Sequence, residues 1–167
     1  MNYRMPDIKD GAKIGELVRN CPPLELNSCY SYILICAHFR DTCVVARDAK
    51  GEVVGFLSAY CPPQVMDVIF IWQVAVRSDM RGQGIATGMI KNLLKRKNLN
   101  DISYVETTVT PSNKQSYNLF HSIAKKLGGG FSERVLFPGS LFGNADHEDE
   151  ILLRIGPINI AKRHGLF

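Results

Sequence analysis

A nearly continuous apolar run at residues 65–76 is followed within a few residues by two glycines and then by a helical pattern. An apolar run of this kind is typical of a β-strand in the middle of a sheet, covered on both faces. It is too short, and with Asp67 and Gln73 inside it too polar, to predict a membrane span. From Ile85 the apolar residues recur at every fourth position, which predicts an amphipathic helix.

The rest of the chain alternates between helical and strand-like segments. Periodic apolar positions and helix boundary signals predict helices at residues 7–19 and 28–39, and another that starts at residues 111–113 and runs to the glycines at residues 128–130. β-rich runs predict strands at residues 42–47, 52–60, 103–110, 131–137 and 150–155. The mixture predicts an α/β fold in a single domain over residues 1–167, with a mixed central sheet and helices on both faces.

Composition and charge argue against several classes of protein. The 20 Lys and Arg residues exceed the 16 Asp and Glu residues by 20 − 16 = 4, a charge too small and dispersed to predict nucleic-acid binding. The 5 cysteines form no C-x-x-C pair, so we expect reduced, mostly buried thiols. The 4 histidines have no paired ligand spacing, and no metal is expected. The N-terminus shows no apolar signal core, so we expect a cytoplasmic protein without a membrane partner.

The glycine segment at residues 81–86 (RGQGIA) lies between the predicted central strand and the amphipathic helix. Glycines there let backbone N–H groups approach an anion, and the positive end of the next helix points to the same place. We therefore expect a phosphate-bearing ligand; the alternative is a turn that merely needs glycine. A Walker loop is excluded because the Lys-Ser/Thr end is missing. A dinucleotide loop, with Gly82, Gly84 and Gly88 as its glycines and Glu106 as ribose contact, is disfavoured, because such loops normally follow the first strand.

The segment from Gln73 to Ala86 strongly resembles the acetyl-CoA signature of the GNAT acetyltransferase superfamily, R/Q-x-x-G-x-G/A. The later helix follows the spacing of a second family motif, N-x-x-A-x-x-L-Y, with Asn113, Ser116, Leu119 and Phe120. The resemblance implies the GNAT fold with splayed central strands, and acetyl-CoA as cosubstrate. It implies that backbone groups of Val74 and Val76 hold the pantetheine arm. The implied pyrophosphate and further cofactor contacts are Arg81, Gly82, Gln83, Gly84, Ile85, Ala86, Asn113, Ser116 and Phe120.

Other segments resemble one group within this family, the L-2,4-diaminobutyrate acetyltransferases of ectoine biosynthesis. These segments are residues 22–32, 36–39, 42–46, 70–76 and 143–150. The resemblance implies acetyl transfer to the γ-amine of L-2,4-diaminobutyrate in a homodimer. The expected substrate contacts are Glu25, Asn27, Tyr30, Trp72, Asn113, His147 and Glu148. The alternatives are a GNAT enzyme for another small amine or polyamine, and an acyl-CoA-binding sensor without activity.

Concentrated negative charge suits a small diamine, which is net cationic at neutral pH. Glu25 and the acidic run at residues 147–150 supply that charge, although a charge run is also typical of a solvated loop. Trp72 either walls the substrate pocket or packs in the core. Tyr30 and Tyr32 lie two positions apart on a helix and cannot face one pocket equally well, and the resemblance favours Tyr30.

Two residues depart from the usual family chemistry. Many GNAT enzymes place a glutamate base where this chain has Gln73, and a tyrosine acid where it has Phe120; Tyr117 is the alternative acid. The attacking amine must be neutral, and removing its proton at pH 7 costs about 4 kcal/mol. We expect Glu150 or Glu25, with His147 nearby, to lower that cost, and acetyl transfer to be direct, without a covalent enzyme intermediate.

Overall fold

A computed structural model describes residues 1–143 and 146–158 of the chain. These residues fall into two compact units. Unit 1 comprises Met1–Tyr60 and Ile71–Asn100, and unit 2 comprises Cys61–Phe70 and the described residues from Asp101 onward. Strand β4 (Val68–Val76) contributes its first residues to unit 2 and its remaining residues to unit 1.

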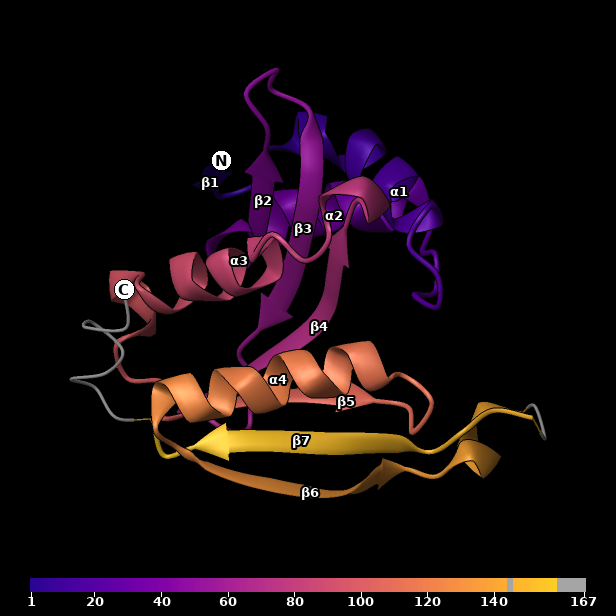
Figure 1. Cartoon of the computed structure of the whole chain (residues 1–167), viewed down its shortest axis with the longest axis vertical. Coiled ribbons are helices and arrows are strands. Elements are labelled where there is room, and N and C mark those ends of the chain that lie inside the picture. The colour runs from indigo at the N-terminus through magenta and orange to yellow at the C-terminus, as the bar shows by residue number, and fades with distance from the viewer. Residues whose placement is uncertain (144–145, 159–167) are drawn as a thin grey trace. The chain divides into compact units, whose positions relative to one another are not determined.

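The strands form a mixed 7-stranded sheet in the order β1-β2-β3-β4-β5-β7-β6 (Figure 1). In unit 1, β1 (Asn2–Arg4), β2 (Val44–Arg47) and β3 (Val53–Tyr60) are antiparallel neighbours. In unit 2, the start of β4 runs parallel to β5 (Tyr104–Val109), with Val68 opposite Tyr104. β7 (Glu150–Gly156) lies antiparallel between β5 and the edge strand β6 (Gly130–Phe137). The mixed α/β sheet expected from the sequence is confirmed.

Helices cover both faces of the strands in unit 1 (Figure 1). On one face, α1 (Gly11–Arg19) and α2 (Cys29–His38) enclose an apolar cluster in which the rings of Tyr32 and Phe56 meet edge to face at 6.2 Å. On the other face lies α3 (Ile85–Leu94), which packs so closely on Gly55 that an added Cβ there would meet two of its side chains. Because Gly55 and Phe56 are neighbours on β3, they point to opposite faces.

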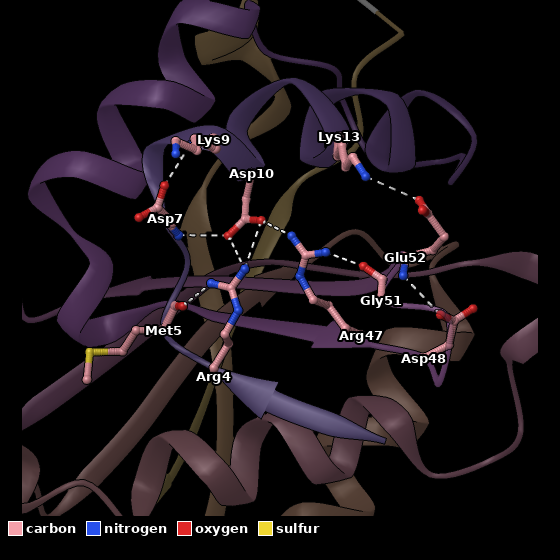
Figure 2. Close-up of polar contacts among 10 residues, drawn as sticks. All are labelled: Arg4, Met5, Asp7, Lys9, Asp10, Lys13, Arg47, Asp48, Gly51 and Glu52. Carbon is pink, nitrogen blue, oxygen red and sulfur yellow. Dashed lines mark hydrogen bonds and ion pairs between the residues drawn. The ribbon is translucent and has the colours of Figure 1, made fainter.

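A buried carboxylate joins the start of α1 to β1 and β2. Asp10 is 1 % exposed and forms ion pairs with Arg4 and Arg47, at 2.9 and 2.5 Å (Figure 2). It also accepts a hydrogen bond from the backbone N–H of Asp7 at 2.7 Å, as part of a capping box around the short 3-10 helix η1 (Ile8–Asp10). A charge is stable at this depth only because it is paired and hydrogen-bonded.

In unit 2, α4 (Lys114–Leu127) presents an apolar stripe to its own strands. The stripe consists of Phe120, Ile123, Ala124 and Leu127, all buried. Asn113 caps the helix by accepting a hydrogen bond from the Ser116 N–H at 3.1 Å, and Gly128 ends it at φ 62°. Asn113 and Gly128 lie within the start signal at residues 111–113 and the stop signal at residues 128–130, and both signals are confirmed.

Four features of the fold differ from the predictions made from the sequence or add detail to them. β1 was not predicted, and the first helix begins with η1 rather than as a continuous α-helix. The connection between β6 and β7 contains the short 3-10 helix η5 (Gly139–Phe142). The prediction that the central strand is covered on both faces is wrong, because Trp72 on β4 is 49 % exposed. Only one face of its second half, that of Ile71, Gln73 and Ala75, is buried.

The cysteines are mostly buried, as the sequence predicts. Cys21, Cys36 and Cys43 are buried free thiols, while Cys29 and Cys61 are free and exposed. Burial raises the pKa of the Cys36 thiol to about 12 and that of Cys43 to about 11. Within residues 1–143 and 146–158, no helix has the length and apolar character needed to cross a membrane.

Candidate active site

The glycine loop turns the chain from β4 into α3 through the short 3-10 helix η3 (Ser78–Met80). Gly82 and Gly84 have φ values of 75° and 77°, in the left-handed region that favours glycine. A Cβ added at either residue meets nothing within 4 Å, so the loop borders open space. Gly84 is also the N-cap of α3, and it supplies no side chain to accept from the first-turn N–H groups.

Positive charge surrounds this loop. The guanidinium of Arg81 donates through Nε to the Val76 carbonyl at the end of β4, at 3.1 Å. Arg77 forms an ion pair with Asp79 at 2.7 Å on the opening turn of the same connection. The helix N-terminus adds about half a positive charge and its unpaired N–H groups. The arrangement fits a diphosphate that would be bound mostly by backbone N–H groups.

Two residues considered for a dinucleotide site have other roles. A Cβ on Gly88 would overlap the Tyr3 hydroxyl, so this glycine lets β1 approach α3. Glu106 pairs with Arg154 in unit 2, and the Arg154 guanidinium lies 3.8 Å from the centre of the Tyr104 ring. Close packing and an ion pair therefore account for both residues.

The two faces of β4 differ in what they present. The side chains of Trp72, Val74 and Val76 alternate with the buried Ile71, Gln73 and Ala75 and are exposed or partly exposed. Trp72 is therefore a surface residue of this strand, which argues against its role as pure core packing. Val74 and Val76 lie on the same open side, where the sequence analysis expects the pantetheine arm.

Two candidate substrate residues, Glu25 and Asn27, lie on the connection between α1 and α2, and a third, Tyr30, lies in the first turn of α2. The Glu25 carbonyl accepts a hydrogen bond from the Gln73 side chain at 2.9 Å, and the Asn27 N–H donates to the Tyr32 hydroxyl at 3.2 Å. Ser28 then caps α2 by accepting from the Ser31 N–H at 3.1 Å. Tyr30 is 68 % exposed and Tyr32 is fully buried, so of the two only Tyr30 presents its ring to solvent.

The candidate residues of α4 divide between capping and core. The side-chain oxygen of Asn113 already caps the helix, and Phe120 is 2 % exposed in the apolar stripe. Tyr117 stacks on His121, with ring planes 13° apart and ring centres 6.2 Å apart. It also meets Phe131 edge to face at 6.0 Å, so aromatic packing fixes the one tyrosine considered as a replacement acid.

The acidic run before β7 is held by a dense set of contacts within unit 2. Glu148 accepts hydrogen bonds from the hydroxyl and the N–H of Ser112. Asp149 accepts from the Gly139 N–H at 2.8 Å, and Glu150 begins β7 opposite Phe137. Asn144, in the resembling segment, lies outside the described residues. The acidic run thus makes specific contacts, while Glu148 and Asp149 remain exposed to solvent.

The orientation of the His147 ring is fixed on two sides. It stacks on Phe142 with ring centres 3.7 Å apart and planes 6° apart. Its Nδ1 lies 2.7 Å from the Glu148 carbonyl oxygen. Because a carbonyl oxygen only accepts, Nδ1 carries the hydrogen, and the neutral ring keeps its lone pair on Nε2. Only in this neutral form does the ring offer Nε2 as a proton acceptor.

With this geometry described, comparison with known proteins decides the family. The sequence profile of the Acetyltransferase (GNAT) family matches residues 12–124. The chain belongs to the GNAT acetyltransferase family. The match runs through both the glycine loop and the capped start of α4, so it includes both motifs on which the resemblance was based.

Relatives of this GNAT chain share more than the fold. It is 47% identical over 156 residues to an L-2,4-diaminobutyric acid acetyltransferase of Bordetella parapertussis, covering 93% of this chain and 84% of the relative. It is 43% identical over 154 residues to the enzyme of the same name from Chromohalobacter salexigens, covering 92% and 80%. A solved structure of diaminobutyrate acetyltransferase EctA from Paenibacillus lautus, in complex with its substrate L-2,4-diaminobutyric acid and coenzyme A, matches with a TM-score of 0.89 and 40% identity, covering 93% and 94%.

The structure also adds residues that sequence reasoning on this GNAT chain did not assign to the site. Tyr32 and Gln73 hold the segment that carries Glu25 and Asn27, and Phe142 holds the ring of His147. Gln73 was visible as the polar residue in an apolar strand, a pattern that signals a buried hydrogen-bond partner. Nothing in the sequence signalled Phe142, because stacking depends on the path of the connection between β6 and β7.

Proposed function

We propose that this chain transfers the acetyl group of acetyl-CoA to the γ-amine of L-2,4-diaminobutyrate, giving N-γ-acetyl-2,4-diaminobutyrate for ectoine biosynthesis. The observation that carries the proposal is the likeness to the Paenibacillus lautus enzyme, whose structure holds that substrate and coenzyme A. At 40% identity and a TM-score of 0.89 over nearly the whole of both chains, the likeness extends well beyond a shared fold.

The chain's own residues support acetyl-CoA as the cosubstrate. Backbone N–H groups of Arg81, Gly82, Gln83, Gly84, Ile85 and Ala86 bind the diphosphate. Val74 and Val76 hold the pantetheine arm through their backbone groups, from the open side of β4. The start of α4 contributes Asn113 and Ser116, with Phe120 packed behind them. The bound cosubstrate supplies an acetyl group that is activated as a thioester.

The diamine is proposed to be recognised by charge and hydrogen bonding. Glu25 and Glu148 attract its ammonium groups, because opposite charge raises the local concentration of a cationic ligand. The further proposed contacts of the diamine are Asn27, Tyr30, Trp72, Asn113 and His147. The ordered connections that carry these residues reduce the entropy lost on binding.

Proton transfer is proposed to use the carboxylates and His147. His147 Nε2 accepts the proton of the attacking ammonium, directly or through a water molecule, and Glu150 or Glu25 stabilises the charge that results. A backbone N–H of β4 polarises the thioester oxygen. Transfer is direct: Cys36 and Cys43 have raised pKa values through burial, which suppresses the nucleophilic thiolate.

Steady-state kinetics with acetyl-CoA and a panel of amines test this proposal. We expect L-2,4-diaminobutyrate to have the highest kcat/KM, above ornithine, lysine and polyamines, and NMR to place the acetyl group on the γ-nitrogen. A higher kcat/KM for another amine would make the chain a GNAT enzyme of different specificity. Acetyl-CoA binding without turnover of any amine would make it a sensor.

The pH–rate profiles of Glu150→Gln, Glu25→Gln and His147→Ala then test the proposed chemistry. We expect His147→Ala to lower kcat about 100-fold, the usual contribution of a positioned base. Unchanged kcat in all three variants at saturating diamine would remove these residues from the chemical step.

The same proposal includes a cytoplasmic homodimer that acts as one GNAT domain. The free thiols suit a reducing compartment, and the family match extends across both compact units. The edge strand β6 and η5 expose several large apolar residues, which suits contact with a second copy. These residues are Val135, Phe137, Leu141 and Phe142.

A further inference from the structure

We propose that Gln73 is a positioning residue whose side-chain amide holds the segment at residues 25–27 ready to receive the diamine. The inference rests on the proposed function, because Glu25 and Asn27 are proposed substrate contacts. It assigns a role to the one residue of β4 that departs from the usual base of the family.

Hydrogen bonds connect this amide to both ends of the segment. Gln73 Nε2 donates to the Glu25 carbonyl at 2.9 Å. Gln73 Oε1 accepts a long hydrogen bond, at 3.5 Å, from the Tyr32 hydroxyl, which itself accepts from the Asn27 N–H at 3.2 Å. Every member of this chain of contacts belongs to unit 1.

Burial makes these contacts specific. Gln73 is 6 % exposed and Tyr32 is 0 % exposed, so water does not replace a lost partner without a change in packing. The backbone of Gln73 is fixed as well, because its N–H donates to the buried Ser58 hydroxyl at 3.2 Å. The backbone of Gln73 is therefore held in place, while the two polar atoms of its side chain make the hydrogen bonds that hold the segment.

The contacts require an amide rather than a carboxylate. An amide donates through its nitrogen and accepts through its oxygen, whereas an ionised carboxylate only accepts. A glutamate here would place an acceptor against the Glu25 carbonyl, and the repulsion would release that end of the segment. A glutamate at position 73, the usual base of the family, is thus incompatible with the hydrogen bond that anchors Glu25 in this chain.

Anchoring the segment lowers the entropy lost when the diamine binds. Loss of the anchoring hydrogen bonds is therefore expected to weaken diamine binding and to leave acetyl-CoA binding and the chemical step largely intact. A residue that acted as a base or through overall stability would change kcat or both Michaelis constants.

The decisive variant is Gln73→Glu, which keeps the size of the side chain. At pH 8 we expect a KM for L-2,4-diaminobutyrate about 10-fold higher than that of the unsubstituted enzyme, the equivalent of one lost hydrogen bond in a buried site. We expect kcat and the KM for acetyl-CoA to change less than about 2-fold. Burial at this position raises the pKa of a carboxyl, so as the pH falls toward 6 a growing protonated fraction regains a donor for the Glu25 carbonyl. The ratio of the two diamine KM values should therefore shrink.

Matched variants separate positioning from stability. Gln73→Met keeps the volume and removes both polar atoms, so it should raise the diamine KM equally at every pH. Thr42→Val removes a hydroxyl that donates to the Phe39 and Ala59 carbonyls elsewhere in unit 1. It should lower Tm and leave the diamine KM unchanged.

A ligand-free measurement makes the inference independent of the substrate. Hydrogen exchange of the Asn27 amide should be faster in Gln73→Met than in the unsubstituted protein, and unchanged in Thr42→Val. If the enzyme does not acetylate diaminobutyrate but exchange accelerates, the proposed function fails and the anchoring holds. Unchanged exchange, or a Gln73→Glu variant with raised kcat and an unaltered diamine KM, overturns the inference.

Discussion

Asp10 illustrates how one side chain joins distant parts of unit 1. Its carboxylate meets two arginines from β1 and β2 and caps the approach to α1 (Figure 2). We expect Asp10→Asn to lower the free energy of unfolding by about 2 kcal/mol, because hydrogen bonds between charged partners are replaced by neutral ones. Urea denaturation at pH 7 measures this. The surface pair of Lys13 with Glu52 is the control, and Lys13→Ala should cost less than about 1 kcal/mol.

The same carboxylate predicts how stability depends on pH. Burial raises the pKa of Asp10, but the hydrogen bond from Asp7 and the contacts with Arg47 and Arg4 outweigh it, and the pKa is lowered overall. A lowered pKa in the folded state stabilises the protein above the pKa of the unfolded chain, about 3.9. That stability is lost as the pH falls through the folded value. The difference in free energy of unfolding between the native protein and Asp10→Asn should therefore become smaller in acid. A difference that stayed constant from pH 7 to 3 would contradict this.

Individual side chains were the least predictable part of the candidate site. The sequence identified Glu25 and His147 as residue types suited to the chemistry, but not the partners that orient them. Gln73 and Phe142 take their roles from contacts between residues far apart in the sequence or across an irregular connection. Hydropathy placed Trp72 in a covered strand, whereas its face of β4 is open.

At the scale of elements, the glycine loop allows a matched comparison. Gly82, Gly84 and Gly51 all have φ values between 75° and 80°, but Gly51 lies in the hairpin between β2 and β3. Alanine at any of them should cost about 1 to 2 kcal/mol of stability. We expect only Gly82→Ala and Gly84→Ala to raise the KM for acetyl-CoA, by about 10-fold or more, since their added Cβ atoms occupy the anion's place. An equal rise in Gly51→Ala would attribute the effect to stability alone.

Element boundaries were predictable wherever local chemistry sets them. Asn113 and Gly128 mark the ends of α4 because a side-chain cap and a left-handed residue are local devices. β1 is only three residues long and has no apolar pattern, and pairing with β2 creates it. Its place beside α3 requires Gly88, which the sequence analysis grouped with the glycines of the loop.

At the scale of the whole molecule, the proposed dimer is open to direct measurement. Analytical ultracentrifugation of the native chain should show a dimer, and the double variant Val135→Lys with Phe137→Lys should be monomeric, because charges opposed across the symmetric contact repel. The control is Met66→Lys, at a residue that is 84% exposed, which should remain a dimer. A native monomer, or a dimer unaffected by the β6 substitutions, would rule out this surface.

The fold class and family followed from motifs that join sequence to backbone geometry. A strand, a turn with positive-φ glycines and a helix N-terminus form a recognisable order of elements. The second motif, at the capped start of α4, makes this order specific to the family. A dimer contact surface could not be recognised from the sequence, because the exposed apolar residues of β6 form a surface only once this strand occupies the edge of the sheet.

The buried sulfurs have a practical consequence for measuring turnover. Each turnover releases the thiol of coenzyme A, and a colorimetric thiol reagent detects it alongside any accessible cysteine. Of the 5 cysteines, only Cys29 and Cys61 are exposed, while Cys36 and Cys43 are further protected by raised pKa values. The native enzyme should therefore contribute a fixed background of two equivalents per chain, rising to five only on denaturation, so that every further increment of colour counts product.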